Sequence, residues 1–252
     1  MRVVTVGTGT VVPDPERGSS CYWVEAGPTR IVMDCGAGAL PGLARARLPW
    51  GRVTHLLISH FHADHIVEIP SLIFALRYGL EIPRAEPLQV WGPPGTRRLF
   101  EAWADAFGVW ILEPDFPLSL HEIAPGERAE LGRLTLRVTS TPHTEESVAI
   151  RLEAGDTHLG YTGDTGTEPA LATFFRDAGL LIAECSLPDE LVGENHLSPS
   201  RVGELAAAAR VARLAVTHLY PQLRGVDVAG LIRAAGYAGE VVMARDGLEL
   251  TL

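Results

Sequence analysis

Lysine is absent from this chain of 252 residues, so all 21 of its basic residues are arginines. Asparagine occurs only once, as Asn195. A GC-rich genome, adaptation to high temperature, or both would produce such a composition. The 31 acidic residues outnumber the basic ones and give a formal net charge of −10. This charge argues against a surface for extended nucleic acid, because affinity for phosphates rests largely on basic side chains.

Cysteine and long apolar runs are scarce as well. Cys21, Cys35 and Cys185 are odd in number and form no Cys-x-x-Cys pair, so we expect reduced thiols and a cytoplasmic protein. No apolar run approaches the roughly 18 residues of a membrane span. Residues 1–6 enter a strand-like pattern at once, without the apolar segment of a signal peptide. We therefore expect no association with a membrane.

Length and periodicity indicate one α/β domain that spans residues 1–252. A hydrophobic content of 46% and a charged content of 21% are ordinary for a globular chain of this size. No linker or low-complexity tract divides it. Apolar periodicity predicts strands at about 2–6, 20–26, 29–34, 53–58, 87–91, 118–123, 131–139, 147–153, 157–162, 179–184, 213–217, 240–244 and 247–251. It predicts helices at about 38–46, 66–79, 95–107, 167–177, 198–211 and 226–235.

A histidine cluster is the clearest functional signal. The chain has only nine histidines, yet His60, His62 and His65 stand together with Asp64 directly after the apolar run 54–58. This spacing is typical of a metal-ligand motif. Imidazole and carboxylate ligands suit Zn²⁺, with Mn²⁺ or Fe as alternatives. In an extended or tightly turned loop His60 and His62 point the same way and can share one ion, whereas Asp64 and His65 turn toward a second ion.

This motif resembles the His-x-His-x-Asp-His signature of the metallo-β-lactamase superfamily, and further motifs follow in that family's order. Thr141-Pro142-His143, the Gly-Asp-Thr motif around Asp164, and Thr217-His218 each come after a strand-like run. The resemblance covers most of the chain. It implies an α/β fold of the four-layer αβ/βα sandwich type, with the metal site at one edge between the two sheets.

The resemblance also implies a set of ligands for two divalent metal ions. Two such ions, held about 3.5–4 Å apart, lower the pKa of a bound water from about 15.7 to near 7 and so supply hydroxide for hydrolysis. Asp64 would in addition accept a proton from that water. The implied ligands are His60, His62 and His143 for the first ion, Asp64, His65 and His218 for the second, and Asp164 as the bridge between them.

Outside the ligands the chain is similar to the ribonuclease Z-like branch of the superfamily. The opening Thr8-Gly9-Thr10, the turn Asp34-Cys35-Gly36, and Glu184 and His196 correspond to motifs of that branch. This similarity implies that His196 is a catalytic acid or oxyanion stabiliser and that Glu184 orients an imidazole. The alternatives are a helix-capping surface histidine and a buried structural glutamate.

One departure from that branch bears on the substrate. Ribonuclease Z enzymes that process tRNA carry a long arm between the third histidine and the bridging aspartate, whereas only about 20 residues separate His143 from Asp164. We therefore predict a phosphodiesterase that acts on a small or nucleotide-like phosphodiester. The alternatives are a lactone, thioester or sulfate-ester hydrolase, a tRNA 3′ endonuclease and, in a different class, a non-catalytic metal-binding scaffold.

Aromatic residues gather between the first motif and His143. Such a stripe is more often core or a dimer face than a wall for a small-molecule substrate, so a homodimer is one expected assembly. The residues are Phe74, Tyr78, Trp91, Phe100, Trp103, Phe107, Trp110 and Phe116.

Overall fold

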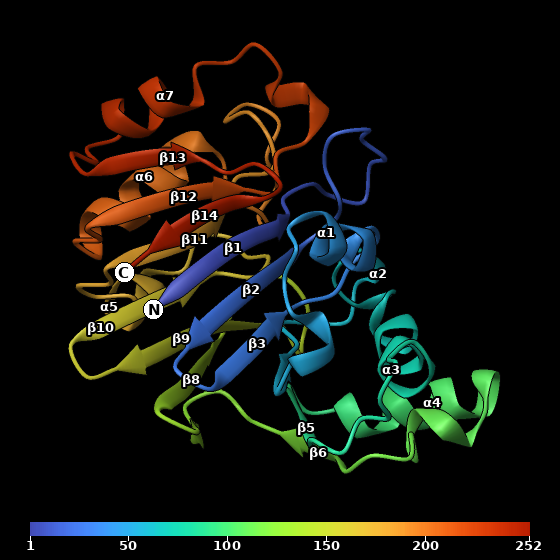
Figure 1. The fold of residues 1–252 in the computed structure, drawn as a ribbon. Coiled ribbons are helices and arrows are strands. Elements are labelled where there is room, and N and C mark those ends of the chain that lie inside the picture. The colour runs from blue at the N-terminus through green and yellow to red at the C-terminus, as the bar shows by residue number, and fades with distance from the viewer.

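The first of two β-sheets contains both ends of the chain in the computed structural model, which covers residues 1–252 (Figure 1). Its strands are β1 (Arg2–Gly7), β2 (Cys21–Ala26), β3 (Thr29–Met33), β4 (His55–Leu57), β5 (Leu88–Gly92), β6 (Leu118–Glu122) and β14 (Leu248–Thr251). Their order in space is β14-β1-β2-β3-β4-β5-β6. The pairs from β14 to β3 are antiparallel, and those from β3 to β6 are parallel.

The second sheet repeats this mixed arrangement. It consists of β7 (Arg128–Leu131), β8 (Leu134–Ser140), β9 (Val148–Ala154), β10 (Thr157–Tyr161), β11 (Leu180–Glu184), β12 (Arg213–Thr217) and β13 (Glu240–Met243). The order in space is β13-β12-β11-β10-β9-β8-β7. Strands β7 to β10 are antiparallel neighbours, and β10 to β13 are parallel.

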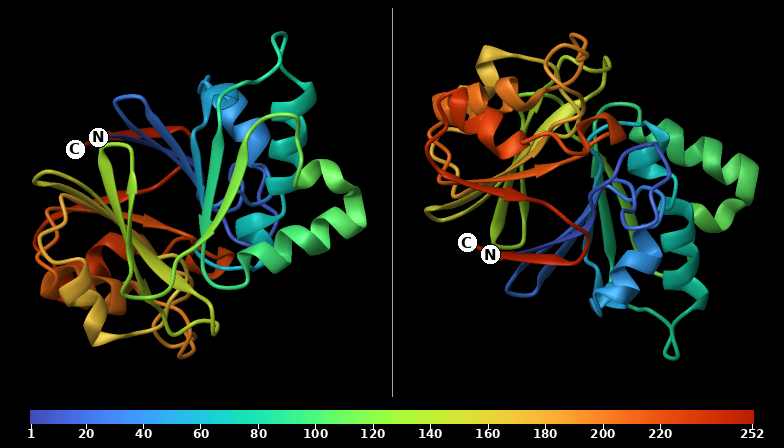
Figure 2. Two further views of the ribbon diagram at one scale, coloured as in Figure 1. Left: turned by 90° about the horizontal axis from the view of Figure 1, so that it is seen from below. Right: turned by 90° about the horizontal axis from the view of Figure 1, so that it is seen from above.

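Helices cover the outer face of each sheet, as the two views of Figure 2 show. Helices α1 (Ala39–Arg45), α2 (Ala63–Ile66), α3 (Ile69–Tyr78) and α4 (Thr96–Phe107) lie on the side of the first sheet, and α5 (Pro169–Phe174), α6 (Pro199–Ala208) and α7 (Val228–Ala234) on that of the second. Short 3₁₀ helices are η1 (Trp50–Arg52), η2 (Val109–Ile111) and η3 (Pro221–Leu223). None of these helices combines the length and the apolar character needed to cross a bilayer.

Three apolar layers hold the four structural layers together. Strand β2 illustrates the alternation: Cys21 and Trp23 point to the helices of the first sheet, whereas Tyr22 and Val24 point to the second sheet. A third cluster, which includes Phe175, fills the space between the second sheet and its helices. Because both faces of each sheet are covered, all of β11 and the first four residues of β2 are buried. The predicted four-layer αβ/βα sandwich is confirmed.

Two predicted elements were wrong in their boundaries. The predicted strand 131–139 is the second arm of a hairpin, because Gly132 adopts a positive φ of 66° and turns the chain between β7 and β8. The predicted helix 66–79 is two helices, α2 and α3. Pro70 has no N–H to bond the carbonyl of Ile66, and the N–H of Glu68 donates instead to the carbonyl of Cys35.

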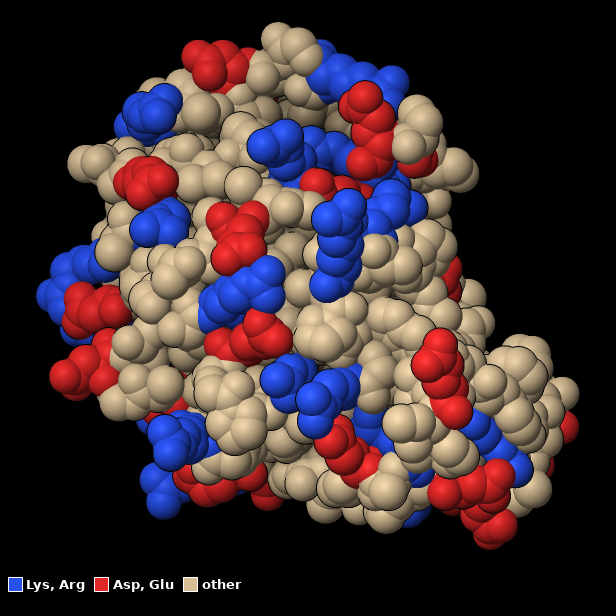
Figure 3. All heavy atoms as spheres, viewed as in Figure 1, with Lys and Arg blue, Asp and Glu red and all other residues tan.

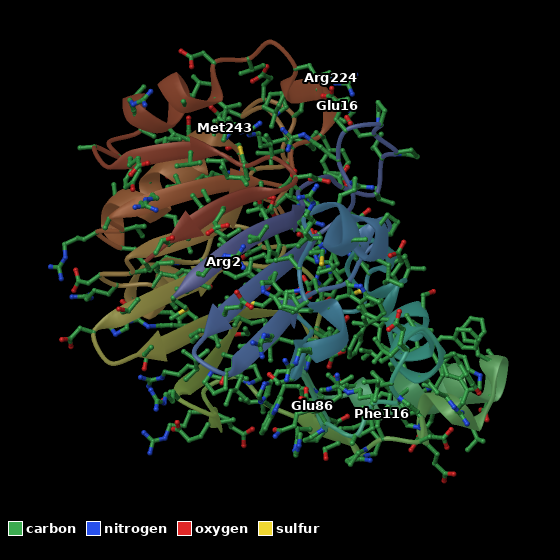
Figure 4. All side chains as sticks on the ribbon, in the orientation of Figure 1. Arg2, Glu16, Glu86, Phe116, Arg224 and Met243 are labelled. Carbon is green, nitrogen blue, oxygen red and sulfur yellow. The ribbon has the colours of Figure 1, made fainter.

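Among the aromatic residues between positions 74 and 116, Trp91, Trp103 and Trp110 are half-buried against the core, and the other five divide into two groups. Phe100 and Phe116 are buried in the core of the first sheet; Phe116 lies in the segment that leads into β6 (Figure 4). Phe74, Tyr78 and Phe107 are about half exposed, at 49%, 58% and 58%. The prediction of a core role is therefore confirmed for the first group, and the predicted homodimer stays a prediction that rests on the second.

Candidate metal centre

Loops at the ends of five strands bring the predicted site residues together at one edge of the two sheets. The carboxyl ends of neighbouring parallel strands share an edge, which is where α/β sheets present ligand-binding loops. The loop after β4 contributes His60 and His62 and leads into α2, which carries Asp64 and His65. The other loops contribute His143 after β8, Asp164 after β10, His196 after β11 and His218 after β12.

The first cluster consists of His60, His62, His143 and Asp164, whose possible ligand atoms all lie within 4.8 Å of one another. His143 Nε2 is 3.0 Å from His62 Nδ1 and 3.7 Å from Asp164 Oδ2. His60 Nε2 is 3.9 Å from the same carboxylate oxygen. A hydrogen bond fixes the orientation of the His143 ring, because its Nδ1 donates to the carbonyl of Asn195 at 2.9 Å. Three imidazoles and a carboxylate thus converge on one point.

The second cluster consists of Asp64, His65 and His218. His218 Nε2 is 3.3 Å from Asp64 Oδ2. Asp164 also faces this cluster, with Oδ1 at 3.3 Å from His65 Nε2 and Oδ2 at 3.6 Å from His218 Nε2. Asp164, the predicted bridging residue, therefore lies between the two clusters that are each predicted to bind one ion.

Backbone geometry at His218 is unusual for a residue with a side chain. Its φ is +58°, in the left-handed region, and its N–H donates to the carbonyl of Thr8 at 3.1 Å. A conformation of this kind costs free energy and tends to occur where a side chain has to be aimed. Here it turns the imidazole at the end of β12 toward Asp64 and Asp164.

These residues fit a pair of divalent metal ions. His60 Nε2 and His65 Nε2 are buried and have no hydrogen-bond partner, whereas nearly all buried polar atoms in proteins have one. Burial lowers the pKa of His60 and thereby favours the neutral imidazole, the form that binds a metal. Burial would raise the pKa of Asp164, but the imidazoles of His218 and His65 outweigh it and keep the carboxylate ionised. The donors are nitrogen and carboxylate oxygen, the set that suits Zn²⁺.

Asp34 positions residues of the first motif through hydrogen bonds, a role that the sequence did not reveal. Its Oδ2 accepts hydrogen bonds from His65 Nδ1, Ser59 Oγ and Tyr161 OH, each at 2.7 Å, and its Oδ1 accepts from the Ser59 N–H at 2.8 Å. Because His65 donates through Nδ1, its Nε2 is the atom that would bind a metal ion beside Asp164. The available signal was the Asp34-Cys35-Gly36 turn, which follows β3, the neighbour of β4.

Glu184 supports both His196 and His218. Its Oε1 accepts from His196 Nδ1 at 2.8 Å, and its Oε2 accepts from Ser186 Oγ at 2.5 Å. Ser186 Oγ in turn is 3.0 Å from His218 Nδ1. Burial would lower the pKa of His196, but the hydrogen bond to Glu184 outweighs it and the pKa is raised. The role of Ser186 was not foreseen from the sequence.

His196 lies at the metal centre rather than at the start of a helix. Its ligand atom is within 4.8 Å of those of Asp164 and His218, and its ring is 4.8 Å from that of His143. The N-cap residue of α6 is Ser198, so His196 does not cap this helix and the helix-capping alternative is wrong. The side chain is 18% exposed and can therefore be reached by a substrate.

Comparison with known proteins places the chain in a family. A sequence model described as the β-lactamase superfamily domain matches residues 29–219. Ribonuclease Z from Mycobacterium sp. strain KMS is 31% identical over 244 residues, which cover 88% of this chain and 85% of that protein. The match thus spans most of both sequences.

Solved structures have the same fold. The metallo-β-lactamase fold protein YhfI from Bacillus subtilis has a TM-score of 0.85 at 23% identity, over 99% of this chain and 98% of that one. The short form of human tRNase Z has a TM-score of 0.82 at 21% identity, over 100% and 99%. With the matched family, this fold and the paired histidine and aspartate clusters, the chain belongs to the metallo-β-lactamase superfamily and is a metal-dependent hydrolase.

Proposed function

We propose that the protein is a dinuclear phosphodiesterase that acts on a small or nucleotide-like phosphodiester. The observation that carries this proposal is the position of His196, which lies beside Asp164 and His218 and is held by Glu184. A proton donor next to two clusters of metal ligands suits displacement at phosphorus, because both the attacking and the leaving oxygen can then be stabilised. Zn²⁺ is the ion that we expect, with Mn²⁺ or Fe as alternatives.

Each proposed catalytic residue has a separate task. Two ions bound by the clusters would supply an acidified water and positive charge for the phosphoryl oxygens. Asp64, largely buried in the second cluster, accepts a proton from the attacking water. His196 donates a proton from its Nε2 to the leaving oxygen, and Glu184 holds Nδ1 so that Nε2 faces the substrate.

Features outside the centre support a small substrate. Strands β9 and β10 form a hairpin with a turn at Gly155-Asp156, so the segment between His143 and Asp164 is taken up by sheet and carries no arm. Figure 3 shows arginines and carboxylates interspersed over one face, with no broad basic area there. These features, together with the net charge of −10, speak against an extended nucleic acid as the partner.

A tRNA 3′ endonuclease is the second candidate function. The mycobacterial relative is called ribonuclease Z, and the chain covers 85% of it. A lactone, thioester or sulfate-ester hydrolase could use the same metal centre, and a non-catalytic metal-binding scaffold is the alternative from another class. The intact pair of clusters weighs against a scaffold, which has no need of both.

A substrate panel separates these functions. The Zn²⁺-loaded protein should hydrolyse bis(p-nitrophenyl) phosphate, leave a penicillin intact and cleave the 3′ trailer of a precursor tRNA weakly or not at all. A lactone, a thioester and an aryl sulfate complete the panel. Preference for one of these three esters would contradict the phosphodiesterase proposal, and efficient cleavage of the tRNA would contradict the argument from the short hairpin. If the protein hydrolysed none of these substrates while both ions were bound, the result would favour the metal-binding scaffold.

A further inference from the structure

A pocket of about 450 Å³ lies beside the metal centre, lined by Phe61, Pro94, Pro125, Glu145 and Glu146. Its residues follow the ends of β4, β5, β6 and β8, so the pocket occupies the carboxyl edge of three parallel strands. Phe61 stands in the chain between two residues of the first cluster, and Glu145 comes two residues after a third. The pocket is therefore within reach of a substrate whose phosphate lies at the metals.

One side of the pocket is apolar. Phe61 is half-buried and packs against the core of the first sheet. Gly95 adopts a φ of +102°, and a Cβ atom at this position would lie 3.2 Å from Phe61 Cε2, so backbone packing holds the ring in place. Pro94 and Pro125 extend the wall with two further rings. Such a surface suits a planar ligand, since a base stacks on aromatic and apolar side chains.

Two carboxylates form the polar side of the pocket. Glu146 is half-buried and Glu145 is exposed. Neither takes part in any of the side-chain hydrogen bonds or ion pairs of the structure, whereas Glu25, Glu153 and Glu240 each pair with an arginine. Ionised carboxylates only accept hydrogen bonds. They would repel a second phosphate and attract the N–H groups of a ligand.

We propose that this pocket is the subsite for a guanine base, so that the substrate is a small guanine nucleotide diester. The proposal rests on the proposed phosphodiesterase function. Guanine presents N1–H and N2–H side by side, and both can bind the two oxygens of the Glu146 carboxylate. In adenine, cytosine and uracil an acceptor lies beside the corresponding donor and would face the carboxylate. Glu145 lies at the rim and adds a weaker, solvent-exposed acceptor.

An organic cation is the competing ligand class for a pocket with acidic residues. Cation recognition uses several aromatic faces around the charge. Phe61 is the single aromatic residue of this pocket, and the two prolines have no π face. All three rings can instead pack on a flat base. The residues that line the apolar side of the pocket thus favour a base over a cation.

The test compares p-nitrophenyl phosphodiesters of guanosine and of cytidine, which share one leaving group. The wild-type protein should prefer the guanosine ester in kcat/KM by at least about tenfold, the discrimination of a bidentate contact to a base. Glu146→Gln, which replaces one acceptor oxygen with a donor, and Phe61→Leu, which removes the π face, should bring the ratio close to one while both ions stay bound. Glu101→Gln, an exposed position on α4, is the matched control and should keep the ratio.

Binding provides a second readout that does not depend on turnover. Calorimetry should show that guanosine monophosphate binds the Zn²⁺-loaded protein more tightly than cytidine monophosphate, and that Glu146→Gln removes the difference. Equal preference for both bases would overturn the subsite, while turnover of bis(p-nitrophenyl) phosphate would still uphold the phosphodiesterase. Preference for a choline-bearing diester over both nucleosides would overturn it in favour of a cation site. Absence of any phosphodiester turnover would defeat the proposed function, and calorimetry would then decide on the pocket.

Discussion

Asp164→Ala should reduce the bound metal from two ions per chain to one or none and lower phosphodiester hydrolysis by about 10³-fold or more. The carboxylate faces His60 and His143 on one side and His65 and His218 on the other, so its loss removes a shared donor from both clusters. Two ions contribute several kcal/mol to the stabilisation of the transition state, and each 1.4 kcal/mol corresponds to a factor of ten in rate. Elemental analysis and steady-state kinetics on the same preparation measure both effects.

The control for this variant is Asp105→Ala, which removes an exposed carboxylate on α4, away from the clusters. It should keep both ions and full activity. Circular dichroism of the metal-free proteins checks that Asp164→Ala is folded. If Asp164→Ala kept two ions and wild-type turnover, the bridging role would be refuted.

His196→Ala should keep both ions but lower kcat by about 10²–10⁴-fold on a substrate with an alkoxide leaving group. His196 lies outside the two proposed ligand sets, and Glu184 holds it with Nε2 free. An alkoxide needs a proton as it leaves, whereas p-nitrophenolate is stable without one. The loss should therefore be much smaller on bis(p-nitrophenyl) phosphate than on a nucleotide diester.

The pattern across leaving groups distinguishes the possible roles of His196. Equal losses on both substrates would replace proton donation with stabilisation of the phosphoryl oxygens, and an unchanged kcat would return the residue to a packing role. His121→Ala is the matched control, since His121 stacks on Trp91 in the first sheet at 4.2 Å and belongs to neither cluster. It should leave the kinetics unchanged.

The candidate metal ligands were predictable from sequence in two ways. The clustering of His60, His62, Asp64 and His65 singled out the first motif, whereas His143, Asp164 and His218 were implied by the resemblance to the metallo-β-lactamase superfamily. The roles of Asp34 and Ser186 were not predicted: the Asp34-Cys35-Gly36 turn was noted only as a motif, and a lone serine carries no comparable signal. Their roles arise when the fold places them against His65 and His218, residues that lie 31 and 32 positions away.

The boundaries of some strands and helices were likewise not predictable from the sequence pattern. The predicted strand 131–139 ran across the turn and missed residues 128–130 of β7, because Leu131 and Leu134 are both apolar and the turn depends on the positive φ of Gly132. The break between α2 and α3 depends partly on Pro70, which the periodicity overlooked, and partly on Glu68. The N–H of Glu68 donates to the carbonyl of Cys35, and its carboxylate accepts from the N–H of Gly38. These contacts join segments far apart in the chain, which a local pattern does not register.

A titration with Zn²⁺ tests the dinuclear hydrolase most directly. Metal-free protein would receive increasing amounts of the ion, while bound metal and hydrolysis of bis(p-nitrophenyl) phosphate are measured on the same samples against a buffer control. Two neighbouring clusters that share Asp164 predict that both quantities rise together and level off at two ions per chain. Full turnover by the metal-free protein, a plateau at one ion, or no specific binding would contradict the account.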